Sequence, residues 1–168
     1  MTHHLWHHVR VVPDFPKAGI EFYDISPLLH QHNQALISAL VAAVPSDLLA
    51  SVDALVAVES RGFILASLLA AHLNKGLILV RKAGKLPPPV HRQSYGLEYG
   101  NDTLEISAEL EPANVLIIDD VLATGGTLTA THQLCQKANL NALGALVLLD
   151  LPALHGDLTL PYWTVFHR

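Results

Sequence analysis

The sequence predicts an α/β fold in which a mainly parallel sheet is flanked by helices. Short, continuously apolar runs of the kind buried on both faces of a sheet alternate with apolar stretches at helical spacing. This alternation indicates right-handed βαβ crossovers. A chain of 168 residues has the size of one compact domain, and no repeat or hydrophilic linker divides it. We therefore expect residues 1–168 to form a single domain.

The expected elements follow from apolar runs bounded by turn residues. In chain order they are a helix at 33–44, a strand at 54–58, a helix at 63–74, strands at 77–82, 103–107 and 115–120, a helix at 128–138, and a strand at 142–149. The strand at 103–107 alternates in polarity and is expected at an edge of the sheet. Residues 13–29, with three prolines and one glycine, predict an ordered, loop-rich segment.

Two segments are expected to lie outside regular structure. Residues 1–9 are predicted to be exposed and flexible, although their histidines His3, His4, His7 and His8 would form two i,i+4 pairs able to hold an adventitious metal ion if helical. Residues 83–102 hold three consecutive prolines and three glycines and predict a long loop. Such a loop in a compact domain is usually functional or mobile.

The composition excludes a disordered chain and disfavours a nucleic-acid binder. Hydrophobic residues make up 51% of the sequence, and the net charge is −5 with neutral histidines, so the chain lacks a basic surface for phosphate backbones. The one cysteine, Cys135, lies in an apolar helical pattern and is expected to be a buried thiol in a reducing compartment. No apolar stretch approaches the ~20 residues of a membrane span, and no signal-peptide pattern begins the chain. We expect a cytoplasmic protein.

The strongest chemical signal is the segment VLIIDDVLATGGT at 115–127. Four apolar residues form a buried strand, and two carboxylates, Asp119 and Asp120, stand at its exit. Gly125 and Gly126 let a ligand approach the backbone where the next helix begins, and the helix N-terminus carries a positive dipole end. A phosphate monoester suits this turn.

The carboxylates would repel phosphate, so they should face another part of the ligand, such as vicinal hydroxyls or a cation. A sugar phosphate satisfies both halves of the segment. The alternative is a strand–turn–helix whose acids serve only as caps. The pair of acids directly after a buried strand disfavours that alternative.

This segment resembles the phosphoribosyl-diphosphate-binding motif of the type I phosphoribosyltransferases. Four further blocks narrow the resemblance to the adenine phosphoribosyltransferase branch of that family: VPDFPKAGIEFYDISPLL (12–29), VESRGF (58–63), RKAGKLP (81–87) and SYGLEYG (94–100). The resemblance implies the type I phosphoribosyltransferase fold with an N-terminal hood segment and a mobile catalytic loop at 83–102. It further implies a homodimer that converts adenine and phosphoribosyl diphosphate to AMP and diphosphate, with Mg2+, in purine salvage.

The resemblance also implies roles for individual residues. Asp119 and Asp120 would address the ribose hydroxyls and, through water and substrate, the Mg2+ ion. Phe22 would stack on adenine, while Glu21 and Tyr23 would read the edge of the base through backbone groups. The 5′-phosphate would be held by Ala123, Thr124, Gly125, Gly126 and Thr127. The diphosphate would be held by Ser60, Arg61, Arg81, Lys82 and Lys85. The groups closest to catalysis would be Glu98, Arg61, Lys85 and Tyr99. A cis peptide is expected between Glu59 and Ser60.

Simpler interpretations remain open for several of these residues. Phe22 would be read as a core aromatic if the resemblance were absent, Arg61 could pair with Glu59, and Arg81 and Lys82 could form a solvated strand end. The chain could also act on another base. A regulator that binds phosphoribosyl diphosphate without catalysis is disfavoured, because the chain has neither room nor basic charge for a DNA-binding module.

Overall fold

The computed structural model describes residues 2–97 and 100–168, in which seven strands form the central sheet in the order β5–β6–β4–β3–β7–β8–β9. Their bounds are β3 (Ala54–Val58), β4 (Gly76–Lys82), β5 (Val90–Leu97), β6 (Gly100–Ser107), β7 (Asn114–Leu122), β8 (Asn141–Asp150) and β9 (Tyr162–His167). From β4 to β9 the neighbouring strands run parallel, whereas β6 is antiparallel to both β4 and β5. The predicted α/β fold with a mainly parallel sheet is confirmed.

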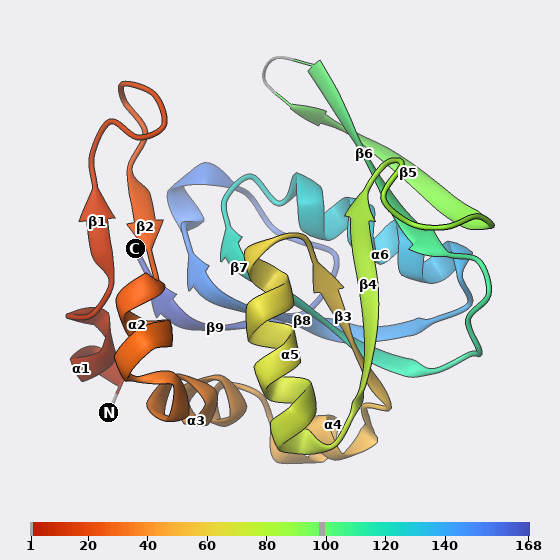
Figure 1. The fold of residues 1–168 in the computed structure, drawn as a ribbon, viewed down its shortest axis with the longest axis horizontal. Helices are drawn as coiled ribbons and strands as arrows, with labels where there is room; N and C mark the ends of the chain where they lie inside the picture. The colour runs from red at the N-terminus through yellow and green to blue at the C-terminus, as the bar shows by residue number, and fades with distance from the viewer. Residues whose placement is uncertain (1, 98–99) are drawn as a thin grey trace.

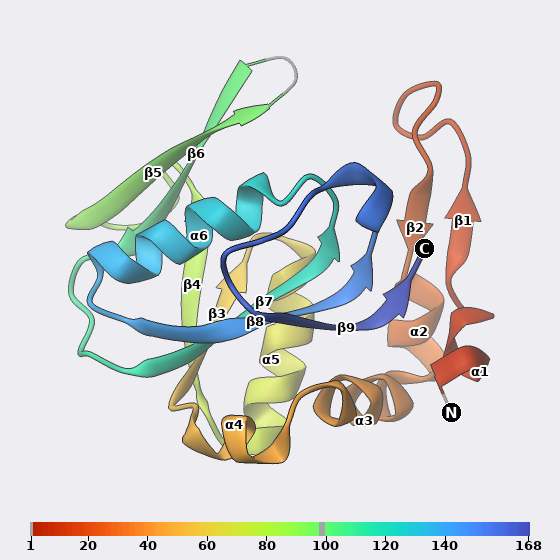
Figure 2. The ribbon, with the colours of Figure 1, turned by 180° about the vertical axis from the view of Figure 1, so that it is seen from behind.

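Helices cover both faces of the sheet. The helices are α1 (Thr2–Trp6), α2 (Ser26–Gln31), α3 (Asn33–Ala43), α4 (Ser46–Ser51), α5 (Arg61–Leu73) and α6 (Gly126–Lys137), with a 3-10 turn η1 (Pro152–Leu154). In Figure 1 α5 lies in front of the sheet, and in Figure 2, seen from behind, α6 lies in front of it. Among the described residues, no helix is both long enough and apolar enough to cross a membrane.

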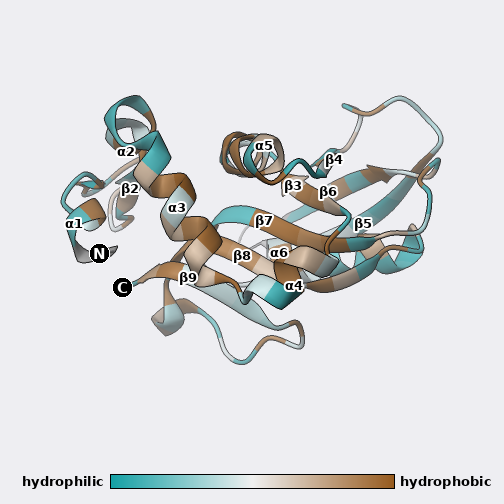
Figure 3. Cartoon of the chain, turned by 90° about the horizontal axis from the view of Figure 1, so that it is seen from below, coloured by the Kyte–Doolittle hydropathy of each residue, from teal (hydrophilic) through white to brown (hydrophobic). Residues whose placement is uncertain are grey.

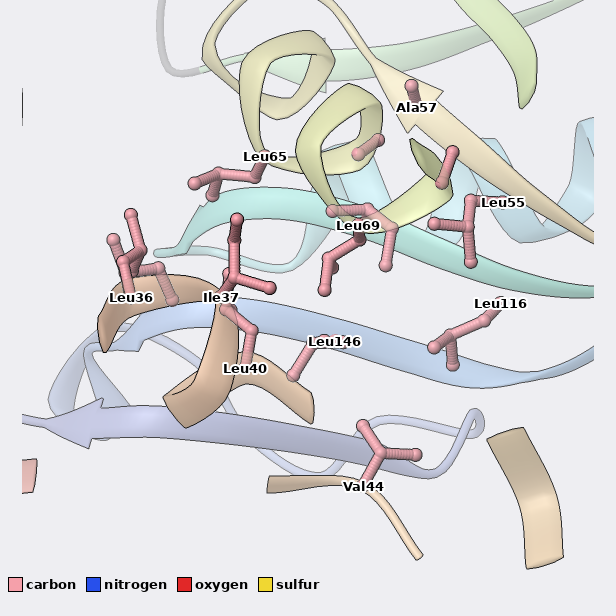
Figure 4. Close-up of a cluster of buried hydrophobic side chains, with 14 of the residues drawn as sticks. Leu36, Ile37, Leu40, Val44, Leu55, Ala57, Leu65, Leu69, Leu116 and Leu146 are labelled. Carbon is pink, nitrogen blue, oxygen red and sulfur yellow. The ribbon is translucent and has the colours of Figure 1, made fainter. Parts of the chain in front are cut away.

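The sheet separates two hydrophobic cores, because successive side chains of a strand point to opposite faces. Leu116 and Ile118 of β7 belong to the core under α3 and α5, whereas Val115 and Ile117 belong to the core under α6. Figure 4 shows the first core, where side chains of α3 and α5 meet Leu116 and Leu146 of the strands. The apolar residues of the central strands colour most of the sheet brown in Figure 3.

The N-terminal residues are better integrated than the sequence predicts. Leu5 is 6% exposed and Val9 is 9% exposed, and both belong to a hydrophobic core. The Trp6 ring packs edge-on against Phe166 at 5.2 Å, and the Arg168 guanidinium lies 3.9 Å from the Trp6 ring centroid. The interpretation of residues 1–9 as a wholly exposed segment is therefore wrong, because apolar residues spaced among the histidines pack against the C-terminal strand.

The segment expected as a long loop at 83–102 is largely a β-hairpin. Strands β5 and β6 pair continuously from Val90 opposite Ser107 to Leu97 opposite Gly100. β6 is consequently an internal strand rather than the predicted edge strand, and β5 forms the edge. The sequence of β5 does not predict a strand, because it is polar. This edge strand is stabilised by its backbone pairing with β6 and by contact with α6 rather than by a buried apolar run.

Candidate active site

Two hairpins project beyond the carboxyl ends of the parallel strands, which is where ligands bind in open α/β sheets. One is the β5–β6 hairpin, and the other is a separate antiparallel pair, β1 (Arg10–Val12) and β2 (Phe22–Asp24). They rise on opposite sides of this edge of the sheet in Figure 1. The predicted site residues that the structure describes lie on or beside β2, at the ends of β3, β4 and β7, and at the starts of α5 and α6.

The turn after β7 forms a small cavity of about 70 Å3, lined by Asp119, Ala123, Thr124, Gly125 and Thr127, among others. Gly125 has a φ of +83° and immediately precedes α6, a left-handed conformation that favours glycine. The free amides of the first turn of α6 follow directly. The turn at 123–127 therefore has the backbone geometry expected of an anion site.

Asp119 and Asp120 are both nearly buried, at 7% and 9% exposed, and lie within β7, which continues to Leu122, two residues beyond the predicted end of the strand. The Asp120 amide donates a hydrogen bond to Asp119 Oδ1 at 2.9 Å. Burial, together with the Asp120 charge, raises the pKa of Asp119 well above its ordinary value. Such a carboxylate pair is costly in the absence of a ligand, and it would be relieved by a cation or by hydroxyl donors.

Gly62 allows α5 to begin directly beside these carboxylates. A methyl group added there would lie 3.0 Å from the Ile118 carbonyl oxygen and 3.2 Å from Asp119 Oδ1. The absence of a side chain thus brings the N-terminal turn of α5, with its positive dipole end, onto the acid pair.

Arg61, the first residue of α5, connects three parts of the site. Its Nε lies 2.5 Å from Asp120 Oδ2, and its Nη1 donates a hydrogen bond to the Tyr23 carbonyl at 2.8 Å. Its guanidinium carbon lies 4.7 Å from the centroid of the Phe22 ring. The interpretation of Arg61 as a simple partner of Glu59 is wrong, since Arg61 pairs with Asp120.

Phe22 lies in a largely apolar hollow at the base of the β1–β2 hairpin. The hollow has a volume of about 460 Å3 and is lined in part by Phe15, Phe22, Arg61 and Ile64. Tyr23 donates its hydroxyl to Glu21 at 3.0 Å, so these two side chains engage each other. Phe22 itself is only half-buried, which distinguishes it from a core aromatic.

Glu59 gathers the basic residues of the predicted diphosphate site. Its side chain, 8% exposed, forms ion pairs with Lys85 and with Arg81, whose Nε lies 3.3 Å from Oε2. It also accepts a hydrogen bond from the Lys82 amide at 3.0 Å. Burial acts to raise the pKa of Glu59, but hydrogen bonds from Lys85 and from the Lys82 amide outweigh it, and the net shift is downward.

The Lys82 side chain points elsewhere, since its Nζ pairs with Asp102 of β6 at 2.9 Å. The structure therefore brings Arg81 and Lys85 together beside Ser60, but it directs the charge of Lys82 towards the neighbouring strand. The Glu59–Ser60 peptide is cis, as expected. Glu59, which orients this cluster, was not among the predicted site residues, although an acid directly after a buried strand was a signal for it.

The remaining candidates are two predicted catalytic residues, the single cysteine and any metal-binding cluster. Glu98 and Tyr99 lie outside the described residues. Cys135 is buried, and burial raises the pKa of its thiol to about 12, so the prediction of a buried thiol is confirmed. Within residues 2–97 and 100–168, no group of three or more His, Cys, Asp or Glu side chains is arranged to hold a metal ion.

The site thus combines an anion-binding turn, two carboxylates beside it, an aromatic face and a cluster of cations. Comparison with known proteins agrees with this chemistry. A family profile described as "Phosphoribosyl transferase domain" matches residues 24–167. An adenine phosphoribosyltransferase of Mycobacterium sp. strain KMS is 49% identical over 154 residues, which cover 88% of this chain and 85% of the relative.

Solved structures of adenine phosphoribosyltransferases also match this chain over nearly its whole length. The adenine phosphoribosyltransferase of Rhodothermus marinus superposes with a TM-score of 0.89 at 40% identity, covering 99% of this chain and 98% of that one. The enzyme from Saccharomyces cerevisiae, complexed with an imino-altritol bisphosphate and adenine, has a TM-score of 0.89 at 36% identity and covers 98% of this chain and 97% of its own. The chain therefore belongs to the phosphoribosyl transferase domain family and, within it, to the adenine phosphoribosyltransferases.

Proposed function

We propose that this chain transfers the 5-phosphoribosyl group of phosphoribosyl diphosphate to adenine, forming AMP and diphosphate in purine salvage. The observation that carries the proposal is the pair of buried carboxylates, Asp119 and Asp120, placed directly before the anion-binding turn at 123–127. A phosphate turn with hydroxyl-binding carboxylates beside it suits a ribose 5-phosphate. The relatives, named for adenine, support that base over hypoxanthine, guanine or orotate.

The 5′-phosphate would be held by the turn from Ala123 to Thr127, whose backbone amides and threonine hydroxyls donate hydrogen bonds. Asp119 and Asp120 would accept hydrogen bonds from the ribose hydroxyls. The two carboxylates suit Mg2+, but only with water and substrate oxygens completing its coordination, because no third protein ligand is arranged beside them in the described residues. The ion would neutralise charge that develops on the departing diphosphate.

The leaving diphosphate would be stabilised by Arg61, Arg81 and Lys85, with Ser60 at the start of the loop. Charges already in place need no reorganisation as the bond breaks. Glu59 fixes Arg81 and Lys85 before the substrate arrives. Lys82, whose ammonium is paired with Asp102 and whose amide donates to Glu59, would contribute by orienting Glu59 more than by touching the diphosphate.

Adenine would stack on Phe22, and its edge would meet backbone groups of the segment from Glu21 to Tyr23. The Tyr23 carbonyl accepts one hydrogen bond from Arg61, and its second lone pair would accept one from the amino group of the base. Glu98 and Tyr99, in the 83–102 segment that we expect to close over the substrates, would manage the proton of the base and exclude water.

We further propose that the enzyme acts as a homodimer in the cytoplasm. Leu77 and Leu79 of β4 pair with Leu55 and Ala57 of β3 and share the face of the sheet that α5 covers. Leu77 and Leu79 are nevertheless 40% and 38% exposed, and Ile64 of α5 is 44% exposed. A second copy would cover this apolar strip, which lies beside Arg81 and so adjoins the diphosphate cluster.

The test is AMP formation by the purified chain with Mg2+, phosphoribosyl diphosphate and an equimolar mixture of adenine, hypoxanthine, guanine and orotate. We expect AMP to dominate the products. Dominance of another nucleotide would reassign the base. Binding of phosphoribosyl diphosphate without any nucleotide formed would support a regulator that binds it without catalysis.

A further inference from the structure

A buried carboxylate lies outside the site described above. Asp150, the last residue of β8, is 1% exposed. Three side chains surround it: His155 Nε2 at 2.7 Å from Oδ1, and the Tyr162 hydroxyl and His167 Nδ1, each at 3.1 Å from Oδ2. A buried carboxylate is tolerated only with such partners. None of these residues takes part in the chemistry proposed above.

The two contacts of His155 define its charge. Its Nε2 faces the Asp150 carboxylate, and its Nδ1 lies 2.7 Å from the Gly156 carbonyl oxygen. A carbonyl oxygen can only accept a hydrogen bond, and a carboxylate oxygen is an acceptor as well, so this arrangement of the two ring nitrogens favours the protonated imidazole. The same two contacts, with the Gly156 carbonyl first, raise the pKa of His155 above its ordinary value.

The titratable groups around this ion pair come from three places in the chain. Asp150 lies on β8, and Tyr162 and His167 lie on β9, with the Tyr162 ring edge-on to His155 at 6.2 Å. Asp157, in the same loop as His155, acts on Tyr162. Asp150 is the carboxylate in direct contact with the His155 ring.

His155 belongs to the segment 151–161, which connects β8 to β9 and is fastened to the sheet at its two ends. The Leu151 amide donates to the Leu122 carbonyl at 3.0 Å, and the Ala145 amide donates to the Pro161 carbonyl at 2.9 Å. Figure 2 shows the segment running from β8 past the N-terminal end of α6 and back to β9. Between those ends, His155 and the apolar residues Leu158 and Leu160 anchor it.

Leu158 reaches the phosphate turn. A methyl group added at Gly125 would lie only 2.8 Å from Leu158 Cδ2 and 3.9 Å from Leu122 Cδ1. Leu158 therefore packs directly behind the residue whose left-handed backbone shapes the turn. The position of Leu158 depends on the path of the segment that the ion pair holds.

We propose that Asp150 and His155 are positioning residues for the donor substrate: their ion pair holds segment 151–161 so that Leu158 supports the turn at 123–127 in its phosphate-binding conformation. This inference rests on the proposed function, since it concerns the same turn. Loss of the pair leaves every group that touches the reacting atoms in place. It therefore raises the KM for phosphoribosyl diphosphate and leaves kcat nearly unchanged.

The pair also gives a pH dependence of defined sign. His155 has a raised pKa in the folded chain, so its contribution is complete below its ordinary pKa of about 6.5 and is lost as pH rises through the raised value. The donor KM of the wild type should therefore rise on the alkaline side. His155→Gln should show a high KM throughout and lack this rise, which separates the effect from titration of the substrate.

The experiment compares the wild type with His155→Gln, Asp150→Asn and the matched control His167→Gln across about pH 6 to 9. His167 contacts the same carboxylate but is 67% exposed and lies outside the segment. We expect His155→Gln to raise the donor KM roughly 3- to 10-fold near pH 6.5, the range for one lost hydrogen bond, with kcat and the adenine KM unchanged. His167→Gln should match the wild type.

A second readout is the NMR titration of the His155 imidazole, which should show an elevated pKa in the wild type and a lower one in Asp150→Asn, where only the contact with the Gly156 carbonyl still raises it. If Asp150→Asn does not fold, His155→Gln alone decides. An unchanged donor KM in an active, folded His155→Gln would overturn the inference. A wild type that forms no AMP would instead contradict the proposed function, so the two failures are distinguishable.

Discussion

Replacing Gly125 by alanine tests whether the turn before α6 holds the phosphate. Gly125 has a φ of +83°, where a side chain costs about 1–2 kcal/mol. Part of that cost is offset because alanine restricts the unfolded chain by about 0.4–1 kcal/mol. The new methyl group would also lie 2.8 Å from Leu158 Cδ2, so Leu158 must rotate away. We expect a net loss of stability on the order of 1 kcal/mol.

Gly19→Ala is the matched control. Gly19 has a φ of +84° and nothing within 4 Å of the added methyl group, so it bears the backbone cost without the contact with Leu158. Each kcal/mol corresponds to roughly 2–4 °C in Tm for a chain of this size. The assay is thermal unfolding of both variants, together with their KM for phosphoribosyl diphosphate and for adenine.

Gly125→Ala should raise the donor KM strongly, whereas Gly19→Ala, which lacks the contact with Leu158, should lose less stability and bind the donor normally. Since each backbone amide bonded to a charged phosphate contributes about 1.5–3 kcal/mol, disturbing one of them should raise the donor KM by at least 10-fold. A Gly125→Ala variant with the donor KM of Gly19→Ala would refute the assignment of this turn to the phosphate.

Three further substitutions, the last with a matched control, test the acid pair, the adenine site and the packing of the N-terminus. The pKa of Asp119 is raised in the folded chain, so the stability of the wild type falls as pH rises through that pKa and the buried carboxyl ionises. Asp119→Asn removes this cost, and the variant should therefore have a higher Tm than the wild type at alkaline pH. Its turnover should fall by roughly 10- to 100-fold, and equal turnover would reduce the pair to a cap. Phe22→Ala should weaken adenine several-fold, for about 0.5–1.5 kcal/mol of stacking, and an equal loss of donor affinity would indicate a core role instead. Leu5→Ala should lower the free energy of unfolding by about 2 kcal/mol or more. The control His7→Ala, at an exposed position, should change it by less than about 0.5 kcal/mol. Equal urea midpoints for the two variants would show that the N-terminus does not pack in solution.

The central strands and the phosphate turn were predictable because each carries its signal within a few residues. The run at 115–118 is apolar on both faces of the sheet, and the glycines and threonines at 124–127 specify the turn whatever surrounds it. The cis peptide and the diphosphate loop were predicted from the resemblance to the family rather than from the residue pattern of the segment itself.

Other features depend on contacts between distant segments. The strand at 90–97 is polar and becomes a strand only through its partner β6 and the helix α6 beneath it. Leu5 and Val9 belong to a hydrophobic core that also contains Phe166 of β9, more than 150 residues away in sequence. The pairing of Arg61 with Asp120 rather than with its neighbour Glu59 depends on how α5 meets β7. No local pattern encodes these contacts.

The most direct test of the central claim is a crystal structure of the chain with AMP and Mg2+. We expect the phosphate on the backbone amides of residues 123–127, the ribose hydroxyls at Asp119 and Asp120, and the adenine ring against Phe22. AMP bound with its phosphate away from this turn, or with its base away from Phe22, would contradict it.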